Sequence, residues 1–113
     1  MRCLIKCVIT VVISTAAVLP ACAAGESEVE AALDAASEHR YSDALAHYRI
    51  AAQFGNVDAQ RNAGLMVLYG ESLYGTEIHA NRTEALQWLG LAAKNGCEVS
   101  TYVLAKLAAR KRV

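Results

Sequence analysis

Few side chains in this sequence have the types and spacing that chemistry at a site requires. The histidines His39, His47 and His79 stand far apart, and none has the spacing of a zinc motif. No serine lies in a nucleophile-elbow pattern, and the glycines at 70 and 75 lack the lysine and the preceding strand of a phosphate-binding loop. We therefore expect no catalytic residue, no metal site and no cofactor, and we expect the three histidines at the surface.

Cys97 is the one side chain that could serve as a nucleophile. It stands just before an expected helix, and a thiol at a helix N-terminus can have a lowered pKa and be reactive. Glu98 beside it opposes ionisation, and the sequence places no histidine near it. A buried, inert small side chain is the expected role of Cys97, and a reactive thiol is the alternative.

The segment 1–23 has the features of a secretory signal peptide. A basic start precedes an apolar stretch at 8–19, and Pro20 is expected to interrupt the helix ahead of small residues at a cleavage site. Cleavage after Ala23 is expected, and cleavage after Ala24 is nearly as favourable. The apolar stretch is shorter than the ~20 residues that a spanning helix needs, which argues against an uncleaved anchor.

An alternative for the same segment is a lipoprotein signal. Leu19-Pro20-Ala21-Cys22 resembles a bacterial lipobox, in which Cys22 would be acylated and become the first residue. Proline at the second position is atypical of that motif. The predicted location is therefore periplasmic or secreted, with a lipid-anchored envelope protein as the alternative. Once a signal peptide leaves, Cys97 has no partner for an internal disulfide, so helix packing must stabilise the fold.

The charge of the chain excludes one class of partner. It has 11 basic and 11 acidic residues, and removal of 1–23, which contains Arg2 and Lys6, leaves 9 and 11, or a net charge of 9 − 11 = −2. No basic stripe is present, so nucleic-acid binding is not expected. The basic cluster at 110–112 is expected to be a solvated helix end that complements the helix dipole, with a membrane or polyanion contact as the alternative.

Two segments of the remaining chain are related by an internal repeat. Residues 44–55 and 85–96 both read A-L-x-x-x-x-x-A-A-x-x-G, and every shared position has the same offset between the copies. The spacing predicts an apolar helical stripe in each segment, and the paired alanines allow a neighbouring helix to approach closely. The final glycine fits the left-handed position that ends a helix. The shared residues are Ala44, Leu45, Ala51, Ala52 and Gly55 in the first copy and Ala85, Leu86, Ala92, Ala93 and Gly96 in the second.

Capping residues divide the chain into five expected helices. Asn56 and Ser42 are expected N-caps, and Asn81-Arg82-Thr83-Glu84 resembles a capping box. Gly64 in a helix interior costs about 1 kcal/mol relative to alanine, which predicts a close helix crossing at that position. The expected helices are 26–38, 43–54, 57–69, 82–95 and 98–110.

At these residues the chain resembles the Sel-like repeat family, a branch of the tetratricopeptide superfamily. The unit of that family runs approximately A-x-x-x-L-G-x-x-Y-x-x-G, a loop, V-x-x-D-x-x-K-A-x-x-W and A-A-x-x-G. The chain departs from it at Val67 in place of tyrosine and at Asn81 in place of aspartate. Glu77 replaces a glycine that stands in the loop just before the V position, and the loop itself is longer. The residues that stand at the positions of the unit are Ala59, Ala63, Gly64, Val67, Gly70, Ile78, Asn81, Glu84, Ala85, Trp88, Ala92, Ala93 and Gly96.

The resemblance implies an all-α fold. The expected architecture is a right-handed α-α solenoid of tandem helix pairs over residues 26–110, with one full repeat at 59–96 and partial repeats on either side. The last helix would be a cap with a polar outer face. Stacks of this kind usually bind proteins or peptides, so the resemblance implies a non-catalytic protein-interaction module with no membrane span in its mature chain.

The loop between residues 70 and 81 is the expected contact with a partner. It combines Leu73, Tyr74 and Ile78 with polar neighbours, and long loops often carry function. The alternative is that these three side chains pack back onto the adjacent helices. Trp88 is expected to be a core residue, with a platform for a ligand as its alternative.

Overall fold

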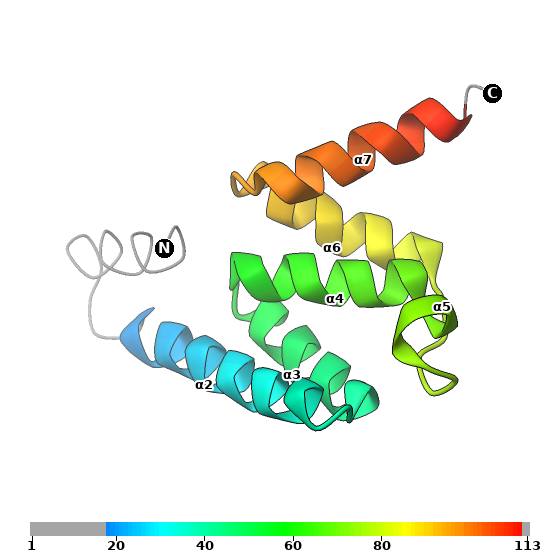
Figure 1. The fold of residues 1–113 in the computed structure, drawn as a ribbon. Helices are drawn as coiled ribbons and strands as arrows, with labels where there is room; N and C mark the ends of the chain where they lie inside the picture. Colours follow the sequence, from blue (N-terminus) through cyan, green and yellow to red (C-terminus); the bar gives the residue numbers. More distant parts are fainter. Residues whose placement is uncertain (1–17, 112–113) are drawn as a thin grey trace.

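The computed structural model describes residues 18–111, and these residues fold into helices without a strand (Figure 1). This confirms the expected all-α class. None of the described helices is long and apolar enough to span a membrane. The helices are α2 (Val18–Ser37), α3 (Tyr41–Gln53), α4 (Val57–Tyr69), α5 (Glu71–Tyr74), α6 (Arg82–Lys94) and α7 (Glu98–Lys111).

The long helices pack chiefly against their neighbours in sequence. The main contacts join α2 to α3, α3 to α4, α4 to α6 and α6 to α7. Figure 1 shows the consequence, since α2 and α7 lie at opposite ends of the layered array and α4 lies between them. Each of the two outermost helices therefore packs mainly on one neighbour.

The helix boundaries agree with the sequence except at the N-terminus. The bounds of α4 are as expected, and those of α3, α6 and α7 lie close to the expected ones. Helix α2 already includes Val18, the first described residue, whereas the sequence predicted a start at Glu26. The expected interruption at Pro20 was wrong, since Pro20 lies within α2, and the fixed φ of proline near −65° is compatible with a helix. The apolar stretch at 8–19 lies almost wholly outside the described residues.

Helices α3 and α6 end in the same hydrogen-bonded turn. The N–H of Gly55 donates to the carbonyl of Ala52 at 3.0 Å, and the N–H of Asn56 donates to that of Ala51 at 3.1 Å. The same two bonds recur at the matching positions that end α6, at 3.0 and 2.9 Å. This is a Schellman motif, which places a left-handed residue after the helix. Gly55 and Gly96 have φ of 90° and 91°, so both expected helix ends are confirmed.

Helix α2 ends in the same motif without a glycine. The N–H of His39 donates to the carbonyl of Ala36 at 3.0 Å, and the N–H of Arg40 donates to the carbonyl of Ala35 at 2.9 Å. His39 has φ 60°, a conformation that costs a non-glycine residue about 1 kcal/mol. Helix α3 then begins at Tyr41 without a side-chain cap. The expected N-cap at Ser42 was wrong, because the tight turn starts the helix earlier.

The two asparagine caps are confirmed. The side-chain oxygen of Asn56 accepts from the N–H of Ala59 at 2.9 Å, and that of Asn81 accepts from the N–H of Glu84 at 3.1 Å. The Glu84 carboxylate is engaged elsewhere, because it pairs with Arg49 through two hydrogen bonds of 3.0 and 2.8 Å. This paired contact joins the start of α6 to α3.

Small side chains let successive helices approach closely. Gly64 on α4 faces α6, and a Cβ atom at this position would lie 2.8 Å from Cγ of Leu89. The close crossing expected at Gly64 is therefore confirmed. The fully buried alanines of the core are Ala32, Ala44, Ala51, Ala59, Ala63, Ala85 and Ala92.

The two copies of the repeat differ in what covers their leucines. Leu45 is buried and lies beside the 77–81 segment, which forms the opposite wall of a small hollow. Leu86 is 38% exposed, so the expected stripe of the second copy is only partly buried.

Candidate functional site

A cleft of about 1050 Å³ separates the α2–α3 turn from the loop that follows α4. One wall consists of residues 39–43, and the other consists of residues 73–77. The loop that the sequence singled out for partner contact therefore forms one side of a cleft, which we call the turn–loop cleft.

The loop is held at both of its ends. Gly70 ends α4 with φ 52° and ψ −130°, and a Cβ at this position would lie 2.5 Å from the backbone nitrogen of Ala80. The N–H of Asn81 donates to the carbonyl of Val67 at 2.7 Å, which ties the end of the loop to α4. The two ends of the loop thus lie against each other, and the intervening residues project as one lobe. This lobe contains the one-turn helix α5, which the sequence did not reveal.

Ile78 and Leu73 take opposite roles in this lobe. Ile78 is 2% exposed and belongs to the core, and its N–H donates to the carbonyl of Gly75 at 3.1 Å. Of the two roles that the sequence left open, Ile78 takes the inward one, so it is not accessible to a partner in this structure. Leu73 is 62% exposed and lines the turn–loop cleft.

Tyr74 links the two walls of the cleft. Its ring meets the Tyr41 ring edge to face, with 5.4 Å between centroids and 71° between planes. Tyr41 contacts His39 in turn, with 3.0 Å from the phenol oxygen to Nδ1. Burial raises the pKa of Tyr74, and the neighbouring tyrosines Tyr41, Tyr69 and Tyr48 raise it further. Tyr74 is therefore neutral at physiological pH. The rings of Tyr41 and Tyr74 together form the aromatic floor of the cleft.

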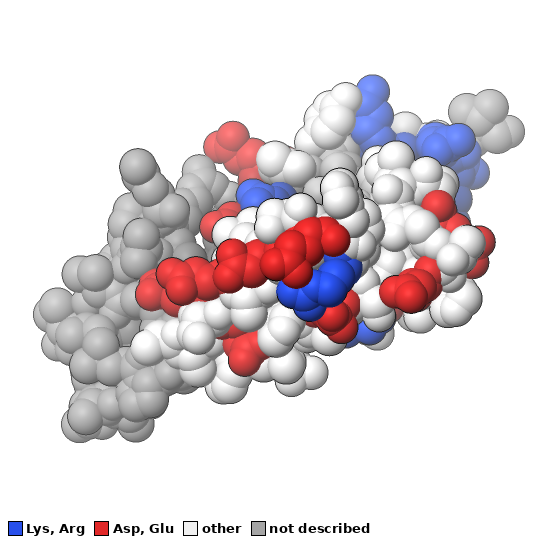
Figure 2. Space-filling model, turned by 60° about the horizontal axis from the view of Figure 1, so that its bottom comes forward, with Lys and Arg blue, Asp and Glu red and all other residues white. Residues whose placement is uncertain are grey.

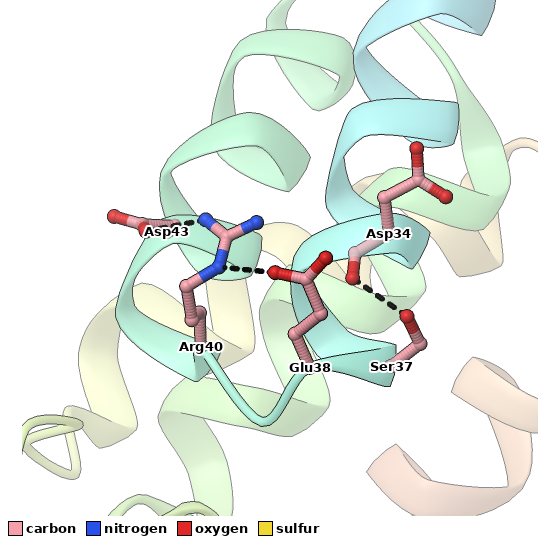
Figure 3. Close-up of polar contacts among 5 residues, drawn as sticks. All are labelled: Asp34, Ser37, Glu38, Arg40 and Asp43. Carbon is pink, nitrogen blue, oxygen red and sulfur yellow. Dashed lines mark hydrogen bonds and ion pairs between the residues drawn. The ribbon is translucent and has the colours of Figure 1, made fainter.

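Arg40 stands at the rim between two carboxylates (Figure 3). Its Nε donates to Oε2 of Glu38 and its Nη1 donates to Oδ2 of Asp43, each at 2.8 Å. Hydrogen bonds from the guanidinium to Asp43 and Glu38 raise the pKa of Arg40. All three side chains are half exposed or more, so these pairs add little to stability, but they fix the position of the rim. With Glu77 on the other wall, acidic groups outnumber basic ones around the cleft.

Cys97 lies away from the cleft, at the start of α7. It is buried, and the hydroxyl of Ser100 donates to its Sγ at 3.3 Å. Burial raises the pKa of the Cys97 thiol, but hydrogen bonds from the hydroxyl and the backbone N–H of Ser100, the charge of Arg61 and the N–H of Val99 outweigh burial and lower it. The expected buried position of Cys97 is confirmed.

The three histidines do not converge on a common site. His47 Nδ1 lies 2.6 Å from Oε2 of Glu28 between α2 and α3, and His79 Nδ1 lies 3.3 Å from Oε1 of Glu71 in the loop. Residues 18–111 contain no group of three or more histidine, cysteine or acidic side chains that could hold a metal ion. His47 is only partly exposed, whereas His79 lies at the surface as expected.

Trp88 packs against the core from α6, as expected, and keeps one side near the surface. Its indole N–H is buried and has no hydrogen-bond acceptor among the described residues. The adjacent surface is a shallow apolar hollow formed with Gln87, Gly90, Leu91 and Lys94. This hollow lies on one helix only, unlike the turn–loop cleft, which has two anchored walls.

Comparison with models of protein families, with curated proteins and with solved structures gives no match for this chain. The fold is therefore described only by its own helices and the contacts between them. The resemblance to Sel-like repeats stays a prediction from the residues quoted above.

Proposed function

We propose that this chain is a non-catalytic module that holds a protein or peptide partner in the turn–loop cleft. The observation that carries the proposal is the position of Leu73. It is a large apolar side chain, exposed on one wall of a cleft whose floor is the Tyr41–Tyr74 pair. Partly exposed apolar and aromatic side chains in a preformed cleft are typical of recognition sites.

The chemistry of the cleft defines the partner segment that it would accept. An apolar side chain of the partner would pack against Leu73 and Tyr74, and the acidic excess from Asp43 and Glu77 favours a neutral or basic segment. The walls are already held in place, by Ile78 in the core and by the close approach of Gly70 to Ala80. A preformed cleft loses little conformational entropy on binding.

The polar groups of the cleft support binding rather than catalysis. His39 contacts Tyr41, and the Arg40 guanidinium is shared between two carboxylates. Among the described residues, no hydrogen bond joins Ser42 or Thr76 of the cleft walls to a base that could activate a hydroxyl. We therefore propose that the protein is not an enzyme and binds no cofactor.

The wider architecture that we propose is the right-handed solenoid of Sel-like repeats, with the full repeat at 59–96. Its support is the recurrence of one turn and one set of alanines in successive helices, together with the glycine crossing at Gly64. A run of small residues at matched positions is what stacked helix pairs require.

We also propose export, on the basis of the N-terminal sequence. The expected product is a periplasmic or secreted chain that starts after Ala23 or Ala24, and the alternative is an envelope lipoprotein attached through Cys22. Mass spectrometry of the N-terminus of the exported chain separates the two. A first residue of Ala24 or Gly25 rules out the lipid anchor, and an acylated Cys22 rules out the free chain.

The binding proposal is tested by crosslinking in the cell that makes the protein. A photo-crosslinking amino acid replaces Leu73 in one variant and Leu91, an exposed leucine on α6, in the other. We expect a crosslinked partner from position 73 that is absent from position 91 and is lost when Tyr74→Ala is added. Equal crosslinking from both positions, or none from position 73, contradicts the proposal.

A further inference from the structure

The outer face of α7 exposes two large apolar side chains. Tyr102 is 62% exposed and Val99 is half exposed, whereas Ser100 is buried and Leu107 is half-buried on the same helix. The expected polar outer face of this last helix is therefore mixed, since Val99 and Tyr102 are exposed among polar side chains such as Glu98 and Thr101. Apolar side chains at helical spacing on an outermost helix indicate that another helix can pack there.

The second half of α7 is basic. Lys106 lies 5.4 Å from the centroid of the Tyr102 ring, and Arg110 and Lys111 follow at the exposed end of the helix. No acidic residue lies between Lys106 and Lys111. A partner for this face thus needs an apolar contact for Tyr102 and negative charge beyond it.

Helix α2, at the other end of the array, has this chemistry. Four exposed acidic residues recur at intervals of four, which places them on one ridge, and Leu33 beside them is 54% exposed. Figure 2 shows acidic side chains in a row across this face of the molecule, while basic side chains gather near its other end. The acidic residues of the ridge are Glu26, Glu30, Asp34 and Glu38.

The carboxylates in the middle of the ridge are available to a partner. In Figure 3 the carboxylate of Asp34 points away from Ser37, whose hydroxyl donates to the Asp34 backbone carbonyl at 2.7 Å. Within residues 18–111, Glu38 is the one carboxylate of the ridge with an ion-pair partner, Arg40 at 2.8 Å. Helix α2 contains no lysine or arginine between Val18 and Ser37 that could neutralise the others.

We propose that the chain associates end to end with a second copy of itself, with the outer face of α7 in one copy packed on the acidic ridge of α2 in the next. With the two helices antiparallel, Tyr102 of one copy lies against Leu33 of the other, and Lys106 and Arg110, one and two turns further along α7, face Glu30 and Glu26. The contact joins unlike ends, so each copy keeps one free end for a further copy unless the assembly closes into a ring.

Charge favours the pairing of unlike ends. A contact of α2 with α2 would bring two acidic ridges together, and a parallel contact of α7 with α7 would bring Lys106, Arg110 and Lys111 of both copies together. Like charges that face each other across an interface oppose association. An antiparallel contact of α7 with α7, in which Glu98 would lie opposite Lys106, does not involve α2, so reversal of the α2 charges distinguishes it from the proposed contact.

The association is expected to be weak and salt-dependent. One helix face on each side is a small area compared with stable interfaces, and the facing charges are exposed and therefore screened by salt. Assembly should accordingly grow with protein concentration at low ionic strength and disappear at about 1 M salt, where the Debye length is only about 3 Å.

The test uses the chain as recovered from the exporting cell, with its N-terminus fixed by mass, and measures molar mass by light scattering after size-exclusion chromatography. One variant carries Glu26→Lys with Glu30→Lys, and a second carries Lys106→Glu with Arg110→Glu. The wild type should reach roughly twice the monomer mass or more at low salt, and each variant alone should stay monomeric. An equimolar mixture of the two should associate again, because each then offers an end that fits the other.

A matched control reverses two charges elsewhere, with Arg82→Glu and Lys94→Glu on α6, and should associate like the wild type. Circular dichroism confirms that each variant is folded. A wild type that stays monomeric at every concentration overturns the proposal, as does an assembly that reversal of α2 leaves unchanged. Failure of the mixture to associate also overturns it. Binding at the turn–loop cleft is measured separately, since Leu73→Asp should not alter self-association.

Discussion

Gly64 on α4 lies directly against Leu89 on α6. A Cβ atom on Gly64 would meet Cγ of Leu89 at 2.8 Å, Cδ2 at 3.0 Å and the backbone nitrogen at 3.2 Å. The leucine side chain could turn aside, but the backbone nitrogen cannot move without a shift of α6. The absence of a side chain at Gly64 therefore sets the distance between the two central helices.

We predict that Gly64→Leu destabilises the protein by more than about 2 kcal/mol, because the new side chain must displace α6. Gly64→Ala should cost less, since overpacking is offset by about 1 kcal/mol of improved helix propensity. Urea unfolding followed by circular dichroism measures both changes.

Gly90 on α6 is the matched control for Gly64. It also lies inside a helix, but no atom lies within 4 Å of the position that its Cβ would take. Gly90→Ala should therefore stabilise the protein by roughly 0.5–1 kcal/mol. Equal effects of alanine at positions 64 and 90 would refute the close-packing argument.

Gly70 should tolerate substitution less well than Gly75. Both have positive φ, 52° and 87°, so alanine strains the backbone at each position. Only Gly70 faces backbone, with Ala80 N at 2.5 Å from the added Cβ, whereas no atom lies near Gly75. Gly75 has ψ 170°, which with its φ lies in a region that is essentially restricted to glycine, so we predict a loss of about 1–3 kcal/mol for Gly75→Ala from backbone strain alone, and a clearly larger loss for Gly70→Ala.

The same unfolding measurement checks the pair of loop glycines. Because Gly70 holds the two ends of the loop together, Gly70→Ala should also weaken any binding that depends on Leu73. Similar stability losses at both positions would show that the contact with Ala80 does not constrain the loop.

The sequence predicted those features that depend on neighbouring residues in the chain. Asn56 and Asn81 cap their helices and Gly55 and Gly96 end them, because cap geometry is decided within one turn. The crossing at Gly64 was predictable because a glycine is costly inside a helix unless another element needs the space.

Features that depend on distant parts of the chain were not predictable. Leu73 and Ile78 stand close together in one loop, but only the packing of Ile78 among residues from several helices decides which of the two is buried. Leu86 matches Leu45 in sequence but is 38% exposed, whereas Leu45 is buried beside a segment, 77–81, that is distant from it in the chain. The break between the first two predicted helices lies where the sequence placed it, but the left-handed residue at His39 was not predicted, because a histidine there replaces the usual glycine.

His39 offers a stabilising substitution. It holds φ 60° at the position that is glycine in the other two turns of this type. We predict that His39→Gly raises stability by about 0.5–1 kcal/mol through relief of left-handed strain, reduced by the loss of the contact with Tyr41. Thermal unfolding reports the change.

The reciprocal substitution is Gly96→His, which places a histidine at φ 91°. It should destabilise the protein by about 1 kcal/mol or more. A stability gain at position 96, or a loss at position 39, would show that backbone strain does not govern these turns.

Tyr48 should make the fold sensitive to alkaline pH. Burial raises the pKa of this core phenol, and opposing effects of a hydrogen bond with Asn62 and the charge of Arg61 only partly offset burial. The unfolded chain therefore loses the proton first, near the ordinary pKa of about 10. The stability that the neutral phenol contributes is fully present below about pH 10 and is lost as the pH rises through the folded-state pKa.

We predict that Tyr48→Phe removes part of the fall in unfolding free energy above about pH 10, whereas Tyr102→Phe at the surface leaves it unchanged. Urea unfolding at a series of pH values measures the slopes, and parallel curves for wild type and Tyr48→Phe would contradict this assignment.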